Sequence, residues 1–337
     1  RNLILTPLPD KKIAVAGAGI TGLVTAYILQ QNGIETHIFE RRDQTGGAIH
    51  TARKDGWQYE YGPNTLLLKD RDVARFLERI GLDDQMLTAN PDASKRFIVK
   101  DDQLEPLPAS VIDAIRTPLF SYGGKLRVLA EPFRGRAGHS GDDGQVEDET
   151  LASFVERRLG RQVLDYAINP FVAGIFASRP EQLSVRHAFP PLYNLEQEYG
   201  SLIAGSVLGR KKRRAAGRVP RKLISFREGM QALPKAISDK LTNVYTGVEV
   251  TSIQRKIDGW MLHANGDERG PFTEVVVNMP LTKWSRELLP VNDAQMSLLR
   301  EVTYQPLSVM IVGYKKEDIS HPLDGFGFLV PEVEGRT

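Results

Sequence analysis

The chain has 337 residues, of which 41% are hydrophobic and 26% charged, an ordinary composition for a globular protein large enough for two or three domains. Lysine and arginine number 44 against 42 aspartates and glutamates, and the resulting net charge of +2 gives no reason to expect a nucleic-acid partner. There are no cysteines, which excludes disulfides, thiolate nucleophiles and thiolate metal sites.

Residues 13–22 predict a buried strand that passes directly into a GxGxxG turn and then a helix. Gly17 allows the tight turn, Gly19 lets the backbone approach a pyrophosphate, and Gly22 lets the helix pack on the strand. At the end of the next predicted strand, 18 residues past Gly22, Glu40 can accept hydrogen bonds from an adenosine ribose. This order predicts a dinucleotide site with the diphosphate at the helix N-terminus.

The residues that follow favour FAD over NAD. Glu40 is followed by Arg41 and then by Gly46-Gly47, which resembles the FAD proteins of the glutathione-reductase type, where a glycine pair brings backbone near the diphosphate and ribityl chain. Read without that resemblance, the glycine pair is only a surface turn. Residues 60–65 resemble the turn-rich segment that passes by the flavin ring in amine-oxidase-like flavoproteins. The expected fold is therefore α/β, with a Rossmann-like FAD-binding domain of this type.

The rest of the chain alternates predicted helices, hairpins and turns. Asp70 can cap a helix that ends at Gly81, and a later helix is expected to start at Asp148 or Thr150. A glycine-, charge- and histidine-rich stretch at 134–144 predicts a mobile loop, and the apolar residues 171–177 fit a buried loop or a bent helix. The remaining predicted elements are a hairpin over 95–108 that turns at 101–102, a helix over 231–241, and strands over 248–256, 260–264, 273–278, 307–314 and 325–330.

Eight basic side chains crowd residues 210–222. Such a run fits a solvated connector, an anionic membrane surface or the capture of a polycarboxylate substrate. Nucleic acid is not favoured, because no aromatic residues or base-reading motif accompany the run.

Several reaction classes lack their key motifs. The six histidines show no paired metal-ligand spacing, and HExxH, GxSxG and P-loop motifs are absent from the sequence. No metal site is therefore expected, and the chemistry falls to a flavin that the protein positions and desolvates.

From Lys11 onward, nearly the whole chain resembles the oxygen-dependent protoporphyrinogen oxidase family. The resemblance is carried by the glycine-rich unit and by residues 149–160, 169–177, 195–203, 229–234 and 325–331. The glycine-rich unit is common to many flavoproteins, whereas the middle and final segments are much more specific to this family.

The resemblance implies a set of site residues. Gly174 matches a glycine whose backbone lies over the flavin and the substrate, Arg96 an arginine that pairs with a porphyrinogen propionate, and Leu329 a leucine that packs on the tetrapyrrole. From the sequence alone, Arg96 also fits an exposed strand position and Leu329 a core position. The expected cofactor contacts are Gly17, Ala18, Gly19, Thr21, Gly22, Glu40, Arg41, Gly46, Gly47, Gly62, Pro63, Asn64, Thr65 and Val250.

The implied reaction converts protoporphyrinogen IX into protoporphyrin IX in three two-electron hydride transfers to FAD, each followed by reduction of molecular oxygen to hydrogen peroxide. No side chain is an obvious base. The alternatives are coproporphyrinogen III, whose four carboxylates would suit extra basic groups, another amine-oxidase-like oxidase or desaturase, and a non-catalytic flavin-binding partner protein.

The resemblance also implies how the chain is organised. It divides into an FAD-binding domain over 11–68 and 225–285, a substrate domain on a mixed or antiparallel sheet over 69–110 and 286–337, and a mostly helical region over 111–224. That region rests on a membrane in several relatives. A cytoplasmic location is expected, which the absence of cysteines permits, with peripheral attachment to the cytoplasmic membrane and homodimer formation left open. Because family members continue past the segment matching 325–331, the chain is expected to be a fragment.

Overall fold

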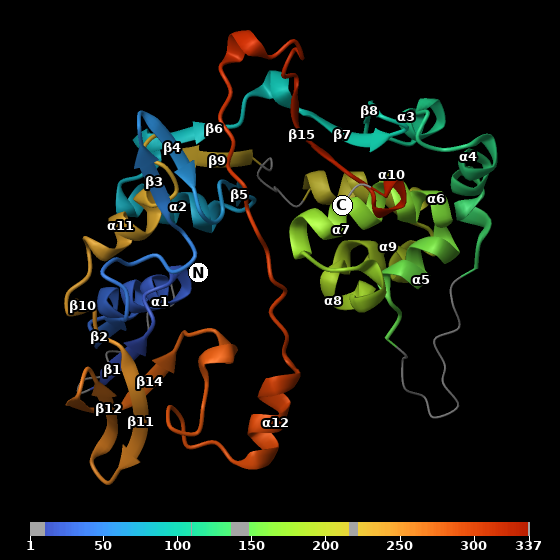
Figure 1. The fold of residues 1–337 in the computed structure, drawn as a ribbon. Helices are drawn as coiled ribbons and strands as arrows, with labels where there is room; N and C mark the ends of the chain where they lie inside the picture. Colours follow the sequence, from blue (N-terminus) through green and yellow to red (C-terminus); the bar gives the residue numbers. More distant parts are fainter. Residues whose placement is uncertain (1–10, 109, 136–147, 216–221, 336–337) are drawn as a thin grey trace. The chain divides into compact units, whose positions relative to one another are not determined.

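The computed structural model describes residues 11–108, 110–135, 148–215 and 222–335. Their contacts form two compact units (Figure 1). Unit 1 comprises Arg1–Ala89 with Val219–Tyr304, and unit 2 comprises Asn90–Arg218 with Gln305–Thr337. The division into three domains made from the sequence stays a prediction.

Unit 1 is built on a four-stranded parallel sheet. The strands lie in the order β10 (Val244–Thr246), β2 (Glu35–Glu40), β1 (Lys12–Ala16) and β14 (Glu274–Val277). Helix α1 (Ile20–Gln31) connects β1 to β2, as the glycine-rich motif predicted. The sheet thus brings the carboxyl ends of β1, β2 and β14 together, which is where nucleotides bind in such folds.

Successive residues of β1 face opposite cores, as expected of a strand buried on both sides. Val15 joins a cluster with α1, α2 (Arg71–Ile80) and α11 (Ala232–Ser238). Ala14 and Ala16 join a second cluster with the antiparallel sheet formed by β11 (Val250–Lys256), β12 (Gly259–Ala264) and β13 (Asp267–Phe272). Helices therefore cover one face of the parallel sheet and a small sheet covers the other.

Shorter elements complete unit 1. Asp70 caps α2 by accepting a hydrogen bond from the Val73 N–H (2.8 Å), and Gly81 ends the helix in the left-handed conformation, so both predicted signals are confirmed. The other elements are a hairpin of β3 (Thr51–Lys54) and β4 (Trp57–Glu60), an antiparallel sheet β5 (Leu66–Leu68), β9 (Lys222–Phe226) and β6 (Met86–Thr88), and α12 (Asp293–Glu301).

Unit 2 places a mixed three-stranded sheet on a helical core. Strand β7 (Lys95–Lys100) pairs with β8 (Gln103–Pro106) in the predicted hairpin and, in parallel, with β15 (Gly325–Leu329) (Figure 1). Ile98 packs into the helical core, with Leu329 against it. The helices are α3 (Val111–Arg116), α4 (Tyr122–Leu129), α5 (Leu151–Arg158), α6 (Arg161–Val163), α7 (Asn169–Phe176), α8 (Val185–Ala188), α9 (Pro190–Tyr199) and α10 (Leu202–Ala215).

A fully buried ion pair anchors helix α10. Arg158 pairs with Glu131, and both side chains are completely buried. Glu131 also accepts hydrogen bonds from the Ser201 hydroxyl (2.6 Å) and the Leu202 N–H (2.9 Å), at the start of α10. Several donors therefore satisfy the hydrogen-bonding capacity of this buried carboxylate.

Some sequence predictions differ from the structure. Residues 307–314 form no strand, and Leu307 and Met310 are 73% and 88% exposed, because no strand among the described residues lies where it would pair with them. Thr150 rather than Asp148 caps α5, and α7 makes the 171–177 segment mainly helical. Most of the predicted loop at 134–144 and residues 216–221 of the basic run lie outside the described residues, while α10 makes the start of that run helical.

Candidate functional site

The glycine turn after β1 has the geometry that its sequence predicted. Gly17 has φ +106°, and a Cβ there would lie 2.5 Å from the carbonyl oxygen of Asn278. A Cβ at Gly22 would overlap the carbonyl of Gly17, so only glycine lets α1 come this close to the strand. Among the described residues no side chain caps the start of α1 at Gly19, which keeps its first N–H groups available to an anion.

Glu40, at the end of β2, forms hydrogen bonds with the backbone of this turn. It is only 7% exposed, and its carboxylate accepts hydrogen bonds from the Ala18 N–H (2.9 Å) and the Arg42 N–H (3.0 Å). Each carboxylate oxygen has a second lone pair, with which it can accept a further hydrogen bond, such as one from a ribose hydroxyl. The contact with a ribose stays a prediction, and the observed role of the carboxylate is to fix the turn.

The second glycine pair packs directly on the first turn. The Gly46 N–H donates to the Ala18 carbonyl (2.8 Å), and a Cβ at Gly47 would lie 3.1 Å from the Gly19 Cα. Gly46 and Gly47 both have positive φ, of 125° and 61°. Two glycine-rich backbones therefore meet at the carboxyl end of β1, which leaves backbone free of side chains where a diphosphate would lie.

The predicted flavin-ring segment runs beside the same region. Gly62 lies against the backbone of Ala48, whose carbonyl a Cβ would overlap. Pro63 and Asn64 are exposed, and Thr65 is half-buried. The backbone of segment 60–65 therefore lies against Ala48, the residue directly after Gly46-Gly47.

The other predicted cofactor residues differ in exposure. Arg41 and Thr21 are exposed, and Thr21 lies in the first turn of α1. Val250 is buried at the start of β11, two residues after Val248, whose N–H donates to the Glu40 carbonyl (2.8 Å). All the predicted cofactor residues thus belong to unit 1.

Sequence reasoning missed two residues of this region. Asn278 follows β14, and its side-chain nitrogen lies 2.9 Å from where a Cβ of Gly22 would be. Its position at the carboxyl end of a strand next to β1 was a usable signal, but it required knowledge of the strand order. The Arg42 guanidinium donates to the Gly47 carbonyl (2.6 Å) and holds the second glycine turn.

The three predicted substrate residues lie together in unit 2. A Cβ at Gly174 of α7 would lie 3.1 Å from Leu329 Cδ2, and Leu329 on β15 pairs in register with Ile98, two residues beyond Arg96 on β7. The Arg96 side chain is exposed and lies 5.9 Å from the centre of the Phe326 ring. No carboxylate among the described residues pairs with its guanidinium, which leaves this cation available to an acidic ligand.

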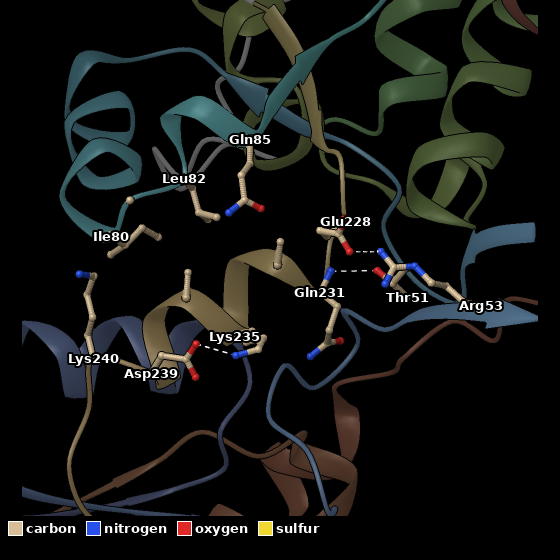
Figure 2. Close-up of a pocket in the computed structure, with 13 residues that line it drawn as sticks. Thr51, Arg53, Ile80, Leu82, Gln85, Glu228, Gln231, Lys235, Asp239 and Lys240 are labelled. Atoms are coloured by element: carbon tan, nitrogen blue, oxygen red, sulfur yellow. Dashed lines mark hydrogen bonds and ion pairs between the residues drawn. The ribbon is translucent and has the colours of Figure 1, made fainter.

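A cavity of about 830 Å³ opens in unit 1 beside α11 (Figure 2). Two ion pairs, Arg53 with Glu228 and Lys235 with Asp239, lie in its walls. None of the residues predicted for cofactor or substrate lines it, although Thr51 and Gln231 do. The residues predicted for the cofactor therefore lie outside the lining of this cavity.

Within the described ranges, no three histidine, aspartate or glutamate side chains cluster as metal ligands would. None of the described helices is both long and apolar enough to cross a bilayer.

Comparison with known proteins places these features in context. The model of the family described as flavin containing amine oxidoreductase matches residues 20–335. Mitochondrial protoporphyrinogen oxidase of Nicotiana tabacum is 33% identical over 355 residues, which cover 96% of this chain and 69% of that protein. Coproporphyrinogen III oxidase of Bacillus subtilis (strain 168) is 28% identical over 95% of this chain and 70% of its own length.

A solved structure supports the fold. The protein from Exiguobacterium sp. 255-15, provisionally named a protoporphyrinogen oxidase, superposes with a TM-score of 0.68 at 23% identity. The match covers 87% of this chain and 64% of that one. The chain thus spans about two thirds of the length of the proteins that it matches.

Proposed function

This chain belongs to the flavin-containing amine oxidoreductase family, and on that premise we propose that it oxidises protoporphyrinogen IX to protoporphyrin IX, with molecular oxygen as electron acceptor. The family makes it an FAD-dependent oxidoreductase, so the cofactor and fold predicted from the glycine turns are confirmed. The substrate and the acceptor are proposals for the whole protein.

The residues present fit FAD. Gly17, Gly19 and Gly47 bring two bare backbone turns together, and no side chain among the described residues caps the first turn of α1, whose N–H groups can face the diphosphate. The bound flavin would supply the two-electron acceptor, and its reoxidation by oxygen would give hydrogen peroxide. Glu40 and Arg42 hold the two turns in place, so that the cradle is formed before the cofactor binds.

The arrangement of Arg96, Gly174 and Leu329 is the observation that carries the substrate proposal. A porphyrinogen combines a large apolar macrocycle with propionate carboxylates at its edge. Leu329 and the bare backbone of Gly174 offer an apolar wall, and the guanidinium of Arg96, with which no described carboxylate pairs, offers a bidentate partner for one propionate. These residues would therefore bind and orient the substrate.

Coproporphyrinogen III is the second candidate, because one relative carries that name. Its four carboxylates would require more free cations. Lys95, the cation next to Arg96, is already paired with Asp324. Because Lys95 is not free to bind a second carboxylate, this ion pair favours protoporphyrinogen IX, which has fewer carboxylates.

The proposed setting is the cytoplasm, with peripheral attachment to the cytoplasmic membrane through the basic run at 210–222 and with homodimer formation. Basic residues near an anionic surface contribute about 1 kcal/mol each, and salt screens the attraction. Sedimentation with anionic vesicles at low and high salt tests the attachment, and light scattering tests the dimer.

The decisive experiment mixes the FAD-loaded protein anaerobically with protoporphyrinogen IX and, separately, with coproporphyrinogen III. The expected result is bleaching of the visible flavin absorbance by protoporphyrinogen IX, with porphyrin fluorescence after oxygen is admitted. Faster bleaching by coproporphyrinogen III would make that compound the substrate instead of protoporphyrinogen IX. If neither compound bleaches the flavin, the substrate proposal is wrong, and the remaining functions are another oxidase of the family or a non-catalytic flavoprotein.

Variants of Arg96 link the reaction to the site. Hydrogen bonds to a charged group contribute about 1.5–3 kcal/mol. Arg96→Ala should therefore raise KM roughly 10- to 150-fold, with a smaller effect on kcat. Arg75→Ala, which removes an exposed arginine of α2, is the control and should change neither constant.

A further inference from the structure

Two segments assigned to the cofactor are joined through Met230 and Gln231, the residues directly before α11. We propose that Gln231, Thr51 and Glu60 form a clamp that holds the turn at 45–47 and the segment at 60–65 in a fixed relation for FAD. Gln231 and Glu60 are its positioning residues. The inference rests on the assignment of these segments to the cofactor, and it does not depend on which porphyrinogen is oxidised.

Gln231 holds the turn at 45–47. Its side-chain Nε2 donates to the Thr45 carbonyl (2.8 Å), which fixes the orientation of the amide because a carbonyl can only accept. A Cβ at Gly46 would lie 3.2 Å from this nitrogen and 3.0 Å from Pro234 Cγ. The turn that bears the second glycine pair is therefore pressed directly against α11.

Glu60 holds the other segment. Its Oε2 accepts from the Thr51 hydroxyl (2.8 Å) and its Oε1 from the Met230 N–H (2.9 Å). The Thr51 oxygen in turn accepts from the Gln231 N–H (2.9 Å), the contact that Figure 2 shows as a dashed line. Hydrogen bonds therefore run without interruption from Glu60, through Thr51 and Gln231, to the Thr45 carbonyl.

The clamp needs a glycine at its centre. Gly229 has φ +82°, and a Cβ there would collide with Thr51 and lie 2.8 Å from Glu60 Oε1. The bare backbone lets the hairpin of β3 and β4 approach the start of α11 closely enough for these bonds. Only glycine combines this conformation with this space.

The polar atoms of the clamp also point to a role beyond packing. The half-buried Glu60 carboxylate has no ion-pair partner within the described part of the chain and is held by a hydroxyl and a backbone N–H. The Gln231 Oε1 is buried and finds no donor among the described residues. Buried acceptors are normally satisfied, so a hydroxyl of the bound cofactor, or a water ordered by it, would complete the site.

This geometry makes a specific functional demand. The turn at 45–47 contacts the Gly17–Gly22 turn through Gly46 and Gly47, whereas 60–65 is assigned to the flavin ring. Cutting the clamp should therefore loosen the cofactor and change the environment of its ring together. If the clamp served only packing, breaking it would lower the stability of the protein without changing both FAD affinity and the environment of the flavin ring.

The test compares FAD-loaded wild type with Gln231→Glu, Glu60→Gln and the double variant. Gln231→Glu keeps the size but replaces the donor facing the Thr45 carbonyl with an acceptor. Glu60→Gln replaces one of two acceptor oxygens with a donor. Gln254→Glu, which makes the same change at an exposed position of β11, is the control. Thr51→Val, which removes only the central hydroxyl, is a further variant that disconnects the same path.

The measurements are the FAD dissociation constant from flavin fluorescence, the flavin absorption spectrum and reduction potential, and the thermal midpoint without FAD. We expect each single clamp variant to weaken FAD binding at least tenfold and to shift the spectrum or potential. The double variant should lose less than the product of the single effects, because both cut one path. The control should match wild type.

Dissociation constants within twofold of wild type in all clamp variants would overturn the proposal, as would fully multiplicative effects. If the variants lose both thermal stability and FAD affinity while the flavin spectrum and potential stay unchanged, the clamp has only a packing role and the proposal is overturned. If affinity responds as expected but neither porphyrinogen bleaches the flavin, the clamp stands and the proposed substrate falls.

Discussion

Replacing Gly174 with alanine should separate protein stability from turnover. Gly174 is an exposed residue within α7, where the added methyl group would lie 3.1 Å from Leu329 Cδ2. That contact is with the end of a flexible side chain, which can move by a few tenths of an ångström. Alanine is better than glycine inside a helix by about 0.5–1 kcal/mol. The variant should therefore be as stable as wild type, or have a Tm higher by roughly 1–3 °C.

Turnover should respond in the opposite direction. If Gly174 and Leu329 form the wall that receives the macrocycle, one added methyl group overpacks it, at a cost of about 1–3 kcal/mol. This corresponds to a loss in kcat/KM of roughly 5- to 150-fold. The assay is porphyrin fluorescence under steady-state conditions, paired with thermal unfolding of the same samples.

Gly123→Ala provides the matched control. Gly123 is also an exposed glycine within a helix, α4, and a Cβ there would meet only the Ser121 Oγ, at 3.9 Å. It should gain similar stability and keep full activity. A Gly174→Ala protein with wild-type kcat/KM would refute the placement of Gly174 at the substrate wall. A stability loss above about 1 kcal/mol would refute the packing argument, since the gain in helix propensity would then be outweighed.

Three further predictions concern charged residues. Arg158→Met should lower the free energy of unfolding by about 3–5 kcal/mol, because it strands the buried Glu131 carboxylate; a loss below 1 kcal/mol in chemical denaturation would contradict this. Glu40→Gln should weaken FAD binding about tenfold, because the two N–H donors meet different carboxylate oxygens and an amide keeps only one of these; unchanged flavin fluorescence titrations would argue against it. The hydrogen bond from Lys95 lowers the pKa of Asp324, so its stabilisation is present above the unfolded pKa and is lost as pH falls through the lowered folded value. Asp324→Asn should therefore remove part of the acid dependence of unfolding measured below about pH 4.

Local chemistry made much of the fold predictable. Asp70 and Gly81 mark the ends of α2 because a side-chain acceptor and a left-handed glycine each satisfy backbone groups of their own helix. Gly22 marks the turn because a Cβ there would overlap the carbonyl of Gly17, a few residues earlier. In each case the physical cause lies close in sequence, so a short window contains it.

Features that depend on distant partners were harder to predict. Residues 307–314 carry the apolar pattern of a strand, but a strand exists only where another pairs with it. β13 contains Gly270-Pro271 and few apolar residues, and its place comes from pairing with β12. Asn278 and Gln231 join the cofactor region through strand order and helix packing, which a motif cannot encode.

The parallel pairing of β15 with β7 constrains when the proposed substrate wall can form during synthesis. Lys95 and Asp324, which pair at one end of these strands, are 229 residues apart in the sequence. At roughly 5–20 residues per second, a ribosome needs about 10–45 s to make the chain between them. The Arg96 strand must wait that long for Leu329, with its hairpin edge unpaired, and a nascent chain is exposed to mispairing and chaperone capture throughout this interval.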